Sequence, residues 1–138
     1  MPAEPLLADT HALLWYFEGS GTVSDRRARL LDAALAEGAL FGSVVSLFEI
    51  GLLLRRGRVR RIPNLRLWAQ RTGALGLVLL PLDADTAVEA SSLPGEPPRD
   101  PMDQLVIAAA RVHGLRLVTR DGPILDYAAG GHVLTLEI

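Results

Sequence analysis

The chain has 138 residues, enough for one domain that buries roughly two thirds of the surface of its unfolded form. It contains no cysteine, which excludes both a disulfide framework and a thiolate metal site. Its net charge of −2 argues against a uniformly basic nucleic-acid-binding protein. No apolar run is long enough to span a bilayer, so we expect a soluble cytoplasmic protein without membrane contact.

Strand-like and helix-like segments alternate along the chain. The first is the uncharged apolar run Leu6–Ala8, which ends abruptly at Asp9 and is followed at once by apolar residues at helical spacing. Other short apolar segments predict strands at residues 40–44, 76–81, 115–119 and 132–136. Further helices are predicted at residues 25–36, 47–54, 65–71, 85–91 and 100–113, with loops at 19–22 and 93–99. Such alternation indicates an α/β fold, a parallel sheet with helices on both faces.

Four acidic residues stand where a parallel sheet would bring side chains to one edge. Asp9 and Asp121 follow predicted strands, and Glu49 lies shortly after the second strand. Asp103 lies in the first turn of the helix that precedes the fourth strand, and a proline-rich loop could fold it toward the same edge. Carboxylates that share a cleft repel one another unless a cation neutralises them. Ligands that are all oxygen suit Mg²⁺ or Mn²⁺ better than zinc.

Each acid also has a purely structural interpretation. Asp9 could simply cap the helix that follows it. Glu49 could complete a capping box that opens with Ser46. Asp103 could be the first-turn acid of a helix capped by Asp100. Asp121 could belong to an ordinary turn. For each acid taken singly, the structural interpretation is at least as good as the catalytic one. The placement of all four acids at one edge of the sheet nevertheless favours a shared site.

The acids lie within longer segments whose order and spacing are distinctive. These are Asp9-Thr10-His11-Ala12-Leu13-Leu14-Trp15, Ser43-x-x-Ser46-x-x-Glu49-Ile50, Arg99-Asp100-Pro101-x-Asp103-x-Leu105 and Thr119-Arg120-Asp121. No single segment is specific, but the ordered set covers nearly the whole chain. It resembles PIN-domain ribonucleases and, more narrowly, the VapC toxins of type II toxin–antitoxin pairs.

The resemblance implies one PIN-like domain over residues 1–138, a three-layer fold with a five-stranded parallel sheet of order 3-2-1-4-5. It also implies Mg²⁺-dependent cleavage of RNA, leaving 5′-phosphate and 3′-hydroxyl ends. The positions that match the family's catalytic, metal-binding acids are Asp9, Glu49, Asp103 and Asp121. The chain departs from many relatives at Gln104, where they have Arg, and at Leu54, where a Lys is frequent. Both departures concern RNA contacts rather than the acids.

The resemblance further implies two protein partners, a second copy of the chain and a cognate antitoxin. The apolar run of Ile50 and residues 52–54 is too wide for one helix face, and with Trp15 it is a candidate homodimer surface. An antitoxin tail that presents an arginine would suit the acidic cleft, because a guanidinium pairs well with carboxylates.

Arginine supplies every basic charge apart from the three histidines, because the chain has no lysine. Five arginines lie close together, at positions 55, 56, 58, 60 and 61. They could contact RNA phosphates, or they could belong to a solvated linker.

Two other functions stay open at this point. One is a metal-dependent α/β phosphatase or receiver-like domain, and the other is a non-catalytic PIN-like domain that only binds a partner. A phosphatase with a nucleophilic aspartate needs a second acid two residues later, where His11 stands. A receiver domain needs a lysine late in the chain, and the sequence contains none.

Overall fold

Five short strands form one parallel sheet. The computed structural model describes residues 2–19 and 23–138, so the predicted loop at 19–22 lies mostly outside the described residues. The strands are β1 (Leu6–Ala8), β2 (Leu40–Ser43), β3 (Val78–Leu80), β4 (Arg116–Thr119) and β5 (Thr135–Glu137). Their order is β3-β2-β1-β4-β5 and each neighbouring pair is parallel, as predicted.

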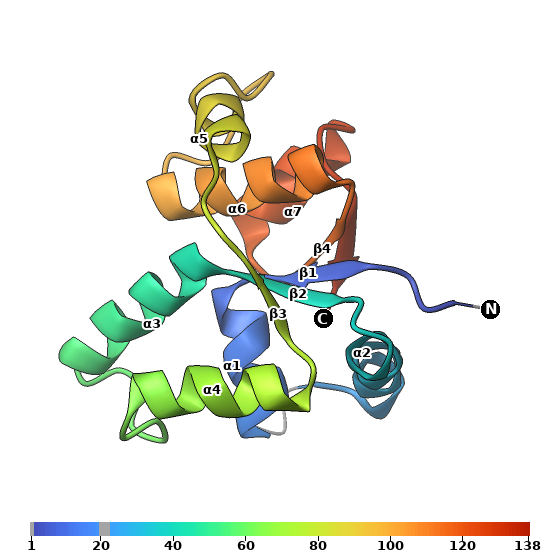
Figure 1. Ribbon diagram of the computed structural model, residues 1–138. Helices are drawn as coiled ribbons and strands as arrows, with labels where there is room; N and C mark the ends of the chain where they lie inside the picture. The colour runs from blue at the N-terminus through green and yellow to red at the C-terminus, as the bar shows by residue number, and fades with distance from the viewer. Residues whose placement is uncertain (1, 20–22) are drawn as a thin grey trace.

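Helices cover both faces of the sheet. They are α1 (Thr10–Glu18), α2 (Asp25–Ala36), α3 (Val44–Arg55), α4 (Leu65–Leu75), α5 (Ala84–Ser91), α6 (Pro101–His113) and α7 (Gly122–Ala129). Figure 1 shows α1, α2 and α4 on one side of the sheet and α5, α6 and α7 on the other, which confirms the three layers. Helix α3 leaves the carboxyl end of β2 and contacts α1, α4 and α6, so it meets both helical layers. Within the described ranges, every helix is too short or too polar to cross a membrane.

Strand β1 is buried on both faces, which explains why its sequence carries no charge. Leu6 and Ala8 belong to the apolar core that Leu13 and Trp68 build from α1 and α4. Leu7 instead packs into the second core, which is formed with α6 and α7. Because alternate side chains of a strand point to opposite faces, these three residues join both cores to the central strand. Asp9 follows directly at the edge of this rigid centre.

Helix α3 begins three residues earlier than predicted. The Ser43 hydroxyl accepts a hydrogen bond from the amide of Val45 at 3.0 Å and caps the helix, so Ser46 is not the cap. The prediction was wrong because Val44 and Val45 are β-branched and extend the apolar run of β2, whereas the cap ends the strand. Ser46 therefore lies inside the helix and is completely buried. This overturns the capping-box interpretation of Glu49.

Helix α7 is absent from the prediction, which placed an ordinary turn there. Asp121 caps it, since its carboxylate accepts a hydrogen bond from the amide of Ile124 at 3.0 Å. Pro123 stands in the first turn, where its fixed φ suits a helix and its missing N–H costs nothing. A turn signal and a helix N-terminus share the same residues here, so the local sequence did not separate them.

Other boundaries shift by a few residues. Strands β3 and β5 are shorter than predicted, and β5 begins at Thr135 instead of residue 132. Helix α4 is longer than predicted and ends at Gly76, whose φ of 123° suits glycine. A Cβ atom at Gly76 would stand 2.6 Å from the Leu35 carbonyl oxygen, so this close approach also requires glycine.

Candidate active site

Asp9 links the central strand to the first helix. Its side chain is only 8% exposed and uses both oxygens in hydrogen bonds. Oδ1 accepts from the amide of Ala12 at 2.9 Å, which confirms that Asp9 caps α1. Oδ2 accepts from the hydroxyl of Thr119, the last residue of β4. Burial raises the pKa of Asp9, while these two hydrogen bonds act in the opposite direction.

Glu49 is oriented by a threonine from another helix. The Thr10 hydroxyl donates to Oε1 of Glu49, and it also shares a hydrogen bond of 3.0 Å with the Ser46 hydroxyl. Thr10 and Ser46 are both buried, so water does not compete for this network. Glu49 lies in the second turn of α3, where its carboxylate is held toward α1 instead of capping its own helix.

Asp121 and Asp9 are tied together through the same buried threonine. The Thr119 hydroxyl accepts from the amide of Asp121 at 3.0 Å while it donates to Asp9. Thr119 is completely buried, so this hydroxyl fixes the ends of β1 and β4 relative to each other. The capping role of Asp121 and its position beside Asp9 are therefore compatible, not alternatives.

Asp103 is the acid that the site perturbs most clearly. It is half-buried in the first turn of α6, which Asp100 caps through the amide of Met102 at 2.9 Å. Burial raises the pKa of Asp103 to about 7, helped by repulsion from Asp121, Asp100, Glu49 and Asp9 in that order. The carboxylates are thus near enough to one another to disfavour full ionisation.

The four predicted acids line a single cleft of about 260 Å³. They reach it from four elements, the ends of β1 and β4, the second turn of α3 and the first turn of α6. The cleft lies at the carboxyl edge of the sheet, beside β1, where the strand order reverses. The other lining residues are Thr10, His11, Trp15, Asp100, Val106 and Arg120.

The lining of the cleft is rich in carboxylate oxygens, the type of donor that Mg²⁺ and Mn²⁺ take. In residues 2–19 and 23–138, no group of three or more His, Asp or Glu side chains is arranged so that it could hold a metal ion. Mg²⁺ usually binds through one or two carboxylates and keeps several of its waters, so it does not need a complete protein cage. A cation would also relieve the repulsion that raises the pKa of Asp103.

Several residues of the site were not singled out from the sequence. The buried hydroxyls of Thr10 and Thr119 orient acids far from them in the chain. In the sequence, only their closeness to Asp9 and Asp121, one and two residues away, hinted at this. Arg120 also lines the cleft, with its guanidinium carbon 4.4 Å from the centre of the Trp15 ring. Its Nε donates to the carbonyl of Ile138 at 2.8 Å.

Sheet order and cleft together define an α/β domain with an acidic site at the point where the strand order reverses. The chain belongs to the PIN domain family, whose family model matches residues 6–130. It is 28% identical over 116 residues to Ribonuclease VapC22 of Mycobacterium tuberculosis, which covers 84% of this chain and 86% of the relative.

Solved structures share the fold at low sequence identity. DNA-bound VapBC from Salmonella typhimurium matches with a TM-score of 0.69 and 16% identity, over 97% of this chain and 98% of that one. A toxin–antitoxin complex from Klebsiella pneumoniae matches with a TM-score of 0.57 and 22% identity, over 96% and 99% of the two chains.

Proposed function

We propose that this chain is an Mg²⁺-dependent endoribonuclease and the toxin of a type II toxin–antitoxin pair. The observation that carries the proposal is the convergence of four carboxylates, from four separate elements, on one cleft. The similarity to Ribonuclease VapC22 supports the reaction, and the likeness to toxin–antitoxin structures supports the biological role.

Asp9 would be the main ligand of the ion, and Asp103, Glu49 and Asp121 would bind it directly or through water. Bound Mg²⁺ supplies a water of lowered pKa and stabilises the charge of the scissile phosphate. The protein's part is to keep its carboxylates in place. Thr119 fixes Asp9, and Thr10 fixes Glu49, through hydroxyls that are buried and protected from water.

The proposal is tested by incubating the purified protein with total RNA in Mg²⁺ or in chelator. Discrete fragments with 5′-phosphate ends are expected in Mg²⁺ and none in chelator. Asp126→Asn should cleave RNA as the parent does, because Asp126 is exposed on α7 and does not line the cleft. RNA that is bound but left intact in Mg²⁺ would instead favour the non-catalytic alternative.

We also propose that an antitoxin tail occupies the acidic cleft and presents an arginine to it. The planar guanidinium can pair with two carboxylate oxygens at once, and a cleft lined by Asp9, Asp103 and Asp121 offers such pairs. The tail would then compete with Mg²⁺ for the same oxygens, so binding would inhibit cleavage.

We also propose that the protein forms a homodimer. The structure changes which side chains of α3 are exposed for the dimer contact. Ile50 is completely buried, and Leu53 and Leu54 pack against the core, so they cannot form most of a contact. The exposed apolar residues of α3 are Phe48, at 58% exposure, and Val44 one turn earlier.

We therefore expect Phe48→Glu to convert the protein from dimer to monomer. A buried phenylalanine contributes about 1.5–3 kcal/mol, and the new charge would have to be desolvated in the contact. Light scattering at tens of micromolar measures the mass. Leu134→Glu, at a residue 68% exposed on another part of the surface, is the control and should leave the mass unchanged. A parent protein that is monomeric at this concentration would contradict the prediction.

A further inference from the structure

A second cavity adjoins the acidic cleft. It has a volume of about 460 Å³, and its lining includes Leu14 and Leu53 on the apolar side and Arg58, Arg60 and Arg61 on the other. We call it the arginine groove. It runs between α1 and the linker that connects α3 to α4.

The arginine groove and the acidic cleft share a wall. His11 and Trp15 line both cavities, and they lie four residues apart on one face of α1. His11 is exposed, Trp15 is half-buried, and their ring centres are 5.8 Å apart. A chain-like ligand that enters the cleft can therefore continue past these rings into the groove.

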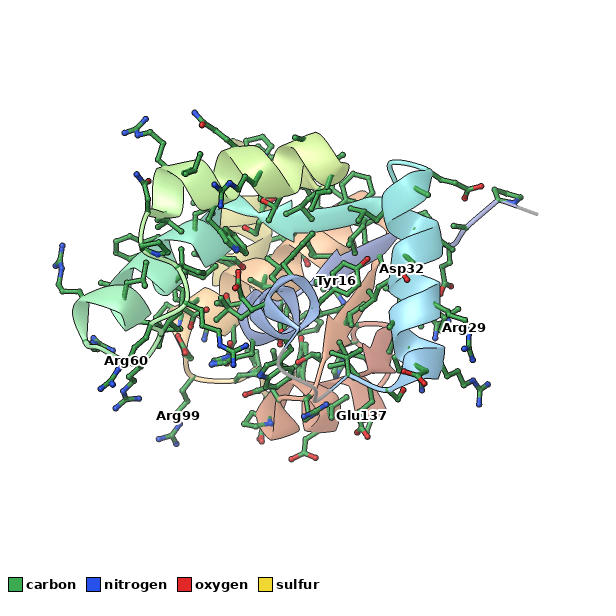
Figure 2. All side chains as sticks on the ribbon, turned by 90° about the horizontal axis from the view of Figure 1, so that it is seen from below. Tyr16, Arg29, Asp32, Arg60, Arg99 and Glu137 are labelled. Carbon is green, nitrogen blue, oxygen red and sulfur yellow. The ribbon has the colours of Figure 1, made fainter. Side chains whose placement is uncertain are left out.

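The groove presents positive charge to solvent. Arg61 donates to the carbonyl oxygen of Glu18 at 3.2 Å, which fastens the linker to the end of α1. The carboxylate of Glu18 accepts from Nε1 of Trp68 at 2.7 Å, so this acid is already engaged. Arg58 and Arg60 are exposed, and no acid within residues 2–19 and 23–138 forms an ion pair with either. Figure 2 shows Arg60 extending outward from the linker.

We propose that the arginine groove binds the sugar–phosphate backbone of single-stranded RNA next to the bond held in the acidic cleft. This inference rests on the ribonuclease proposed above and names the form of its substrate. Guanidinium groups suit phosphates, and aromatic rings at the junction suit an unstacked base. In a duplex the bases are stacked on one another, so they could not reach His11 and Trp15.

The cluster of five arginines thus divides into two functional groups. Arg58, Arg60 and Arg61 line the groove, whereas Arg55 and Arg56, at the end of α3, do not. This division offers a matched comparison. Arg58→Gln with Arg60→Gln removes two charges from the groove, and Arg55→Gln with Arg56→Gln removes two charges a few residues away.

The test measures binding of a fluorescein-labelled, 12-nucleotide single-stranded RNA by anisotropy, in chelator and over a range of salt. For the groove pair we expect the log–log salt slope to fall by roughly 1.4, about 0.7 for each lost phosphate contact. Affinity at 0.1 M salt should fall by about tenfold or more. The control pair should change the slope by less than half as much, and circular dichroism should show both variants folded.

Three results would overturn the inference. Equal losses of RNA affinity in both double variants would show a diffuse charge effect. An unchanged salt slope in the groove variant would show that the groove does not contact RNA phosphates and would favour a protein partner there. An equally large loss for a duplex of the same sequence would refute the single-stranded form. Cleavage is scored separately on the parent protein in Mg²⁺. Groove-dependent binding without cleavage would refute the ribonuclease and not the groove.

Discussion

Replacing Asp9 with Asn should reduce RNA cleavage by more than about 100-fold, because even the outer partners of a metal site contribute 10–100-fold. The substitution preserves the shape of the side chain and the acceptor for the amide of Ala12, so α1 should keep its cap. It removes one negative charge from a buried position in a cleft that four other acids line. The loss of activity should therefore occur in a protein that is still folded.

The order of stability of the parent and Asp9→Asn should reverse when Mg²⁺ is added. In chelator, Asp9→Asn should be as stable as the parent or more stable, by up to about 1 kcal/mol. Asn loses the acceptor for the Thr119 hydroxyl, but burial, which disfavours the charged side chain of the parent, is the larger effect. In millimolar Mg²⁺ the parent gains binding free energy that the variant lacks, so the parent should become the more stable protein.

Melting curves of both proteins, with and without Mg²⁺, measure this reversal, and a cleavage assay is run on the same samples. Asp126→Asn should follow the parent in every condition, since its side chain is exposed outside the cleft. If the two curves shift in parallel when Mg²⁺ is added, Asp9 is only a helix cap and the metal site is wrong.

The second large effect concerns the pH dependence of the metal-free protein. Burial and repulsion raise the pKa of Asp103 from 3.8 to about 7, so between these values the folded protein binds more protons than the unfolded chain. The free energy of unfolding should then decrease as pH rises from about 4 to about 7. The penalty is absent below the unfolded pKa and complete above the folded one.

Asp103→Asn should remove much of this decline. Because Asp103 is only half-buried, solvent screens part of the effect, and we expect a gain on the order of 1–2 kcal/mol at pH 7, or several degrees in Tm. Some decline should persist, since burial also raises the pKa of Asp9. Melting temperatures in chelator from pH 4 to 8 test this, and a variant curve parallel to the parent's would refute it.

The sequence alone determined the architecture and the identities of the acids. Leu6–Ala8 carries no charge because it is buried on both faces, and an uncharged run that ends at an acid and leads into a helix already predicts a buried parallel strand. Asp9 and Asp121 follow strands that the pattern locates well, so their meeting at one edge follows from parallel pairing. These features depend on periodicity along the chain, which a sequence records directly.

The tertiary structure decided how the acids are held and which of their local interpretations is correct. The Glu49 carboxylate accepts a hydrogen bond from Thr10, 39 residues away, and the Asp9 carboxylate accepts one from Thr119, 110 residues away. The division of the clustered arginines depends equally on where the linker after α3 lies against α1. Hydrogen bonds and cavities of this kind arise between elements distant in sequence, and the chain's local pattern carries no signal of its long-range partners. That is why Ser46 resembles a helix cap in the sequence but is a buried partner of Thr10 in the folded protein.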